Sequence, residues 1–179
     1  MSLPETISTE RLLLRPPRLD DAEALYYGYG TDLEVVRYLT WKPSESVEQA
    51  RDFLRSDIDN RSQRTSFSWA ITIKPEDRLV GMIAARPKGD EIDFGYVLAR
   101  AHWGKGYMTE ALKAMIATSF ANPLVNRVWA VCDIDNNASA AVMRKAGMRF
   151  SRIIVGGALH PNISDHPRDV ECYEAIRDL

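Results

Sequence analysis

The chain has 179 residues, of which 45% are hydrophobic and 27% charged, the balance of a folded globular protein rather than a disordered one. Its formal net charge of −2 provides no overall positive field for nucleic acid, and no apolar stretch has the length of a membrane span. Cys132 and Cys172 lie far apart in apolar segments and are expected to be free, buried thiols. The first residues contain no basic segment followed by an apolar run, so we expect no signal peptide. We therefore expect a cytoplasmic protein with neither a nucleic-acid nor a membrane partner.

The first third of the sequence predicts one strand followed by helices. Residues 11–15 form an apolar run typical of a strand. Three pairs with capping-box spacing, in which a capping residue precedes a Glu or Gln by three positions, indicate helix starts. These pairs are Asp20 with Glu23, Thr31 with Glu34, and Ser46 with Gln49. The first helix is expected to run to about residue 29, and the third carries an apolar stripe.

The middle of the sequence predicts an antiparallel meander. Apolar residues from Phe67 to Ile73 alternate with smaller or polar ones, the period of a half-buried strand. A turn over 74–78 leads to a strand at 79–85, and a second turn over 87–90 leads to a strand at 92–98.

The last part contains the clearest helix. From Met108 to Phe120 the apolar residues fall on one helical face, and Pro123 ends the pattern. A strand, a helix ended by Gly147 and two final strands follow, over residues 127–132, 137–146, 150–155 and 170–176. The strand–helix–strand passage implies neighbouring parallel strands within an otherwise antiparallel sheet. The sequence therefore predicts a mixed α+β fold.

The segment Trp103-Gly-Lys-Gly-Tyr107 lies between an expected strand and the clearest helix. A helix start offers unpaired N–H groups and partial positive charge, and glycines let the backbone approach an anion closely. The segment predicts a pyrophosphate-binding loop, with an ordinary strand–helix turn as the alternative. It matches neither the P-loop, where Ser or Thr would follow Lys105, nor the dinucleotide fingerprint, where Thr109 would be glycine.

Several ordered segments resemble a known family. Asp93-Phe-Gly-Tyr-Val-Leu98 followed by His102-Trp-Gly-Lys-Gly-Tyr-Met-Thr-Glu-Ala111 is similar to the acyl-CoA-binding core of the Gcn5-related N-acetyltransferases (GNAT). Residues 7–15 and 135–148 resemble further segments of its RimJ/RimL-like branch of ribosomal-protein N-terminal acetyltransferases. The likeness spans residues 7–177. It implies a single GNAT-type domain whose central sheet of about seven strands is mixed, mostly antiparallel and splayed, with helices on its flanks.

The resemblance implies acetyl-CoA as cosubstrate and no metal. The sheet would open between the strand around Tyr96 and the strand around Trp129. The pantetheine arm would lie in that gap and the pyrophosphate on the loop amides. The cofactor-binding residues so implied are Val97, Leu98, Trp103, Gly104, Lys105, Gly106, Tyr107, Met108, Thr109, Asn136, Ser139 and Met143. Many family members carry a proton-donating tyrosine at the position of Met143, which has no proton to give, so Ser139 is the nearest replacement.

The expected reaction is direct attack of a primary amine on the thioester in a ternary complex. Asp93 and Glu91 are the candidate general bases, with exposed strand carboxylates as the alternative interpretation. A protein N-terminal α-amine is the leading acceptor, because α-amines with a pKa of ~8 need little base.

Two alternatives stay open at this level. One is a small-molecule amine acceptor, such as a polyamine, amino acid or antibiotic, and the other is a non-catalytic, CoA-binding regulatory module. A monomer or a homodimer is expected. His160, His166 and Cys172 match no compact metal-ligand spacing.

Overall fold

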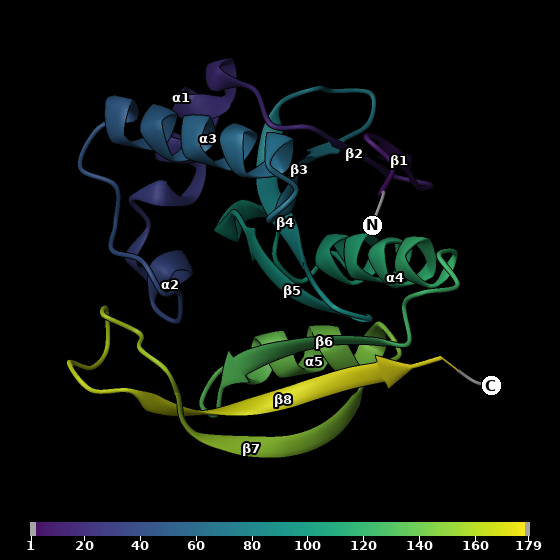
Figure 1. The fold of residues 1–179 in the computed structure, drawn as a ribbon. Helices are drawn as coiled ribbons and strands as arrows, with labels where there is room; N and C mark the ends of the chain where they lie inside the picture. Colours follow the sequence, from purple (N-terminus) through teal and green to yellow (C-terminus); the bar gives the residue numbers. More distant parts are fainter. Residues whose placement is uncertain (1–2, 178–179) are drawn as a thin grey trace.

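The computed structural model describes residues 3–177, built around one sheet of eight strands in the order β1-β2-β3-β4-β5-β6-β8-β7 (Figure 1). The strands are β1 (Ile7–Ser8), β2 (Leu12–Arg15), β3 (Phe67–Ile73), β4 (Leu79–Lys88), β5 (Glu91–Leu98), β6 (Arg127–Asp133), β7 (Arg149–Ala158) and β8 (Arg168–Ile176). The α-helices are α1 (Ala22–Leu25), α2 (Leu33–Val36), α3 (Val47–Ser62), α4 (Tyr107–Phe120) and α5 (Asn137–Lys145). Within residues 3–177, no helix is both long enough and apolar enough to span a bilayer.

Strand pairing confirms the predicted mixed sheet. Neighbouring strands run antiparallel except for β5 and β6, which are parallel and joined through α4. The sheet has eight strands instead of about seven because the two-residue β1 pairs with β2 at one edge. A strand of two residues is too short to show a period in the sequence. β4 also runs through Pro87 to Lys88, where a turn was expected, because its last residues still pair with β5.

Helices cover both faces of the sheet (Figure 1), and this changes the character of β3. Trp69 and Ile71 belong to the core beneath α4 and α5, whereas Ala70 belongs to the core beneath α1 and α3. All residues from Phe67 to Thr72 are buried. The prediction of a half-buried strand was therefore wrong, because small residues on its second face pack under helices rather than facing water.

Of the three predicted helix starts, only that of α3 keeps its predicted capping residue. The Ser46 hydroxyl accepts a hydrogen bond from the Gln49 amide at 3.1 Å, and the Gln49 side chain accepts from the Glu45 amide. Before α2 the cap is Asp32 rather than Thr31, since the Asp32 carboxylate accepts from the Glu34 amide at 3.0 Å. The shift by one residue shows that spacing alone does not select between adjacent polar residues.

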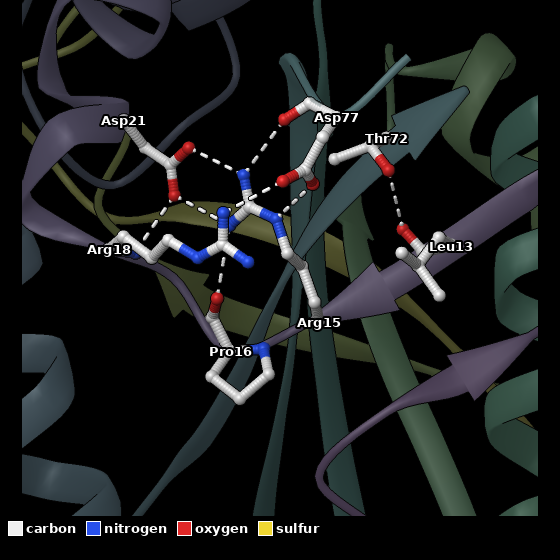
Figure 2. Close-up of polar contacts among 7 residues, drawn as sticks. All are labelled: Leu13, Arg15, Pro16, Arg18, Asp21, Thr72 and Asp77. Carbon is white, nitrogen blue, oxygen red and sulfur yellow. Dashed lines mark hydrogen bonds and ion pairs between the residues drawn. The ribbon is translucent and has the colours of Figure 1, made fainter. Parts of the chain in front are cut away.

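The first helical segment is organised by Asp21 instead of Asp20. Its carboxylate accepts from the Arg18 amide and from two nitrogens of the Arg15 guanidinium at 2.7 and 2.8 Å (Figure 2). Arg15 also bonds Asp77 in the β3–β4 connection, and both Arg15 and Asp21 are buried. A buried guanidinium needs a carboxylate partner, because loss of one partner costs roughly 3–5 kcal/mol. The segment accordingly begins as a 3-10 turn, continues as the short α1 and ends in a π-helical turn at Gly30.

The sheet opens between β5 and β6. These strands pair only from Glu91 to Phe94 on β5, opposite Arg127 to Ala130 on β6. Beyond this point β5 continues beside β4 and β6 continues beside β8, so the two strands diverge (Figure 1). The predicted splay is confirmed, and it leaves one side of residues 95–98 without a strand partner in the part of the chain that the structure describes.

Candidate active site

A cleft of about 890 Å³ lies where β5 and β6 diverge, within the size range of small-molecule sites. Its walls come from the segment between β1 and β2, from α2 and the residues after it, from the end of β5 with the glycine loop, and from α4 and α5. Ten of the twelve predicted cofactor residues line it: Val97, Leu98, Trp103, Gly104, Gly106, Tyr107, Met108, Thr109, Asn136 and Ser139. The cleft thus joins the glycine loop to the opening of the sheet.

The glycine loop has a backbone shape that side chains disfavour. Gly104 and Gly106 have φ angles of +73° and +79°, the left-handed region in which glycine is relaxed. The Trp103 indole donates to the Leu98 carbonyl at 2.7 Å and fixes the loop to the end of β5. Because α4 begins at Tyr107 in the cleft wall, the unpaired amides of its first turn lie at the same place. Main-chain donors and the helix dipole together give this part of the cleft the chemistry that suits an anion.

An N-terminal clamp holds this loop, and sequence reasoning missed it. Arg11 donates to the Glu110 carboxylate at 2.7 Å and to the Lys105 carbonyl at 2.9 Å, and its guanidinium lies 4.7 Å from the Tyr107 ring centre. The Thr9 hydroxyl donates to the same carboxylate at 2.6 Å. Burial acts to raise the pKa of Glu110, but the bonds from Thr9 and Arg11 outweigh it and lower that pKa. A carboxylate this close to an anion site would repel the ligand, so its pairing with Arg11 removes an obstacle to binding.

At the opposite end of the cleft, hydroxyl groups from β5 and α5 meet. The Asn136 side chain caps α5 by accepting from the Ser139 amide at 3.1 Å. The Ser139 hydroxyl oxygen lies 2.8 Å from the Tyr96 hydroxyl oxygen, and the tyrosine also reaches the Ser139 carbonyl at 3.2 Å. Tyr96 lines the cleft although sequence reasoning treated it only as a strand residue. Local sequence patterns could not predict this contact, because the two residues are 43 positions apart and belong to different elements.

Both cysteines are free and buried, as predicted. Burial raises the pKa of the Cys132 thiol to about 12, and a hydrogen bond with Ser139 only partly opposes this effect. Cys132 is therefore a neutral thiol near neutral pH, whereas a nucleophilic cysteine requires the thiolate.

The predicted general bases are placed elsewhere. Asp93 bonds Arg86 at 2.8 Å and Glu91 bonds Arg127 at 2.9 Å. Both carboxylates belong to the part of β5 that is still paired with β6, and neither lines the cleft. The expectation that they lie beside the gap is corrected by the register: the strands separate only after Phe94, beyond both residues.

Two predicted cofactor residues also lie outside the cleft lining. Met143 is fully buried in the core that α4 and α5 share with the sheet. The Lys105 side chain donates to the Ala101 carbonyl, and its own carbonyl accepts from Arg11, so this residue serves the shape of the loop. Ser139 and Met143 are four positions apart and share a helical face, but one turn beyond Ser139 this face packs into the core instead of lining the cleft.

The β7–β8 connection reaches across to the segment that follows α2. The Asn162 side chain donates to the carbonyls of Val36 and Trp41 at 2.7 and 2.8 Å. His160 is buried with its ring 3.6 Å from the Asp133 carboxylate. No group of three or more metal-ligating side chains gathers anywhere in residues 3–177. The connection thus forms a fixed border beside the cleft wall that α2 provides.

Known proteins with similar sequences and structures share this architecture. A family model for the acetyltransferase (GNAT) domain matches residues 11–149. The uncharacterized N-acetyltransferase p20 of Bacillus licheniformis is 35% identical over 144 residues, covering 78% of this chain and 79% of that protein.

Two solved structures extend the comparison. A GNAT-family acetyltransferase from Bacillus anthracis superposes with a TM-score of 0.83 at 26% identity, covering 96% of this chain and 98% of that one. The second structure is RimL, a ribosomal L7/L12 alpha-N-protein acetyltransferase solved in complex with coenzyme A. It superposes with a TM-score of 0.85 at 21% identity, covering 97% of this chain and 99% of that one, which shows a common fold. By its family match and its sequence relatives, the chain belongs to the GNAT acetyltransferase family and is an N-acetyltransferase of that type.

Proposed function

We propose that the chain transfers the acetyl group of acetyl-CoA to the N-terminal α-amine of a protein, by direct attack of the amine in a ternary complex. The observation that carries this proposal is the single cleft that contains both the glycine loop and the diverging ends of β5 and β6. An anionic head group suits the loop, and an extended arm suits the unpaired side of β5.

The cofactor would be held mainly by the backbone. Its pyrophosphate would lie on the amides from Trp103 to Met108, where glycine dihedrals and the start of α4 concentrate N–H donors. The pantetheine arm would run beside Val97 and Leu98 as an added strand does, since β5 has an open side there. The Leu98 amide is our candidate for polarising the thioester oxygen.

The state of Cys132 supports direct transfer over a covalent acyl-enzyme. Its thiol is 5% exposed, and with a pKa of about 12 it does not provide a thiolate near neutral pH. The amine itself then forms the new C–N bond while the C–S bond of the thioester breaks.

The placement of the acidic groups supports an α-amine acceptor. The two predicted bases are paired with arginines outside the cleft, and the Glu110 carboxylate in the cleft wall is occupied by Arg11 and Thr9. The other two acidic residues in the cleft lining, Glu10 and Glu34, are exposed to solvent. An α-amine has a pKa of about 8 and is partly neutral at pH 7. A lysine amine has a pKa of about 10.4, so it is almost fully protonated at pH 7 and needs an effective base. RimL, which shares the fold, is itself described as an alpha-N-protein acetyltransferase.

A panel of acceptors tests the proposal. The protein is incubated with acetyl-CoA and peptides that carry a free N-terminus, the same peptides with a blocked N-terminus and one lysine, or small amines, and released thiol is measured. We expect turnover with free N-termini and loss of turnover on blocking. Faster turnover of a polyamine, amino acid or antibiotic would contradict the acceptor assignment. Tight CoA binding without turnover of any amine would indicate a regulatory module.

A further inference from the structure

We propose that Tyr96 is a positioning residue for acyl transfer, whose hydroxyl holds the Ser139 hydroxyl so that the serine proton is directed at the sulfur of the departing CoA. This inference rests on the proposed function and adds to it a residue on β5. The contact that motivates it is the 2.8 Å separation of the two hydroxyl oxygens.

The position of Tyr96 in the cleft brings it to the acyl end of a bound cofactor. On β5 the cleft is lined by Leu98, Val97 and Tyr96, and not by Gly95 or the residues before it. An arm that starts at the glycine loop and follows β5 therefore reaches Tyr96 last. Ser139 faces this point from α5 and lines the same cleft. The sulfur end of the arm is thus expected beside the hydrogen-bonded hydroxyl pair, next to Ser139.

Hydrogen-bond geometry indicates the direction of the donors. A separation of 2.8 Å is ideal for O–H···O, whereas the 3.2 Å contact to the Ser139 carbonyl is weaker. That carbonyl lies inside α5, where helix amides supply donors. When Tyr96 donates to the serine oxygen, the serine proton is directed away from the tyrosine, and a sulfur in the cleft would compete for it with the Cys132 sulfur, which also bonds Ser139. A tyrosine donor also polarises the serine O–H, which strengthens the bond it makes in turn.

Tyr96 keeps its own proton throughout the step. Burial raises the pKa of its hydroxyl, and the bond with Ser139 opposes this effect only in part. In the reaction the amine nitrogen forms the bond to the carbonyl carbon, the C–S bond breaks, and its electron pair goes to sulfur. The amine loses its proton to solvent, and the Ser139 O–H donates a hydrogen bond to the sulfur as negative charge develops there. The pair therefore stabilises the thiolate without transferring the tyrosine proton.

The next residue of α5 on the face of Ser139 provides no donor to this point. Met143 lies one turn beyond Ser139, is fully buried and carries no polar hydrogen. At this point the structure offers a hydroxyl pair contributed by two elements, Tyr96 from β5 and Ser139 from α5.

The test measures the pKa of the thiol of CoA bound to the protein, from the ultraviolet absorbance of the thiolate against pH. Ligand-free protein is subtracted, and Cys132 contributes little because its pKa is about 12. The variants are Tyr96→Phe, Ser139→Ala and the double variant. Tyr27→Phe is the control, since Tyr27 is 70% exposed and does not line the cleft.

We expect each single substitution to raise the pKa of the bound thiol by about one unit, and the double variant to add little to the larger single effect. With an amine acceptor, Tyr96→Phe should lower kcat about tenfold and leave the KM for acetyl-CoA within about twofold. A purely structural role would instead lower Tm and CoA affinity without moving the thiol pKa. If CoA binds all variants and its thiol pKa is the same in each, the inference is wrong but the proposed function is unaffected. If CoA does not bind the unmodified protein, both are wrong.

Discussion

The two ends of the cleft offer different kinds of hydrogen-bond donor. At the loop end the donors belong to the backbone, and the left-handed Gly104 and Gly106 set their directions. At the splayed end they belong to side chains, with Tyr96 and Ser139 meeting across the divergence of β5 and β6. A backbone site depends on the shape of the main chain, so one substitution that changes this shape should displace several donors at once. A side-chain site loses one hydrogen bond at a time, and its losses are graded.

The largest effect is expected for Gly104→Leu. A leucine would be strained at a φ of +73°, and its side chain would occupy the space that the proposed pyrophosphate needs. CoA affinity, measured by calorimetry, should fall about 100-fold or more. Gly89→Leu is the matched control, because Gly89 has a φ of +66°, no atom near its missing Cβ, and a place in the β4–β5 turn. Both variants should lose roughly 1–2 kcal/mol of stability. Equal CoA affinities in the two variants would contradict the backbone site.

A smaller effect is expected for Arg11→Ala, which tests whether a side chain maintains the backbone site. The substitution removes the side-chain bonds to Glu110 and to the Lys105 carbonyl and leaves the carboxylate beside the loop without its cationic partner, although the Thr9 hydroxyl still donates to it. CoA affinity should fall about tenfold, while kcat at saturating acetyl-CoA stays near its original value. Arg51→Ala, which removes an exposed pair with Glu48 on α3, should leave both parameters unchanged. A fall in kcat alone would show that the clamp acts on chemistry rather than on binding.

The smallest effect is expected for Asn136→Ala at the splayed end. Loss of an N-cap costs about 1 kcal/mol, and Ser46→Ala removes the equivalent cap of α3 away from the cleft. Thermal unfolding should therefore detect similar losses in both variants. Only Asn136→Ala should also lower kcat, by a few-fold, because the capped Ser139 amide anchors the serine that meets Tyr96. If both variants had unchanged rates, the cap would be purely structural.

Signals that span a few residues were sufficient to predict much of this molecule. The apolar face of α4, the cap at Ser46 and the left-handed Gly147 each follow from neighbours within two helical turns. The glycine loop belongs to the same class, since its two dihedrals and the following helix start are local properties. The prediction that Asp20 caps the first helix was wrong. Arg15 is buried against the β3–β4 connection and needs a carboxylate partner, and Asp21 provides it.

Local sequence alone thus predicted the succession of strands and helices apart from β1, the α+β class and a glycine turn directly before a helix start. The folded chain alone decided that Arg11 meets the Lys105 carbonyl across 94 positions and that Tyr96, rather than Asp93, borders the cleft. The physical reason is strand register. The residue at which β5 leaves β6 depends on pairing along the whole sheet, and no period within either strand encodes it.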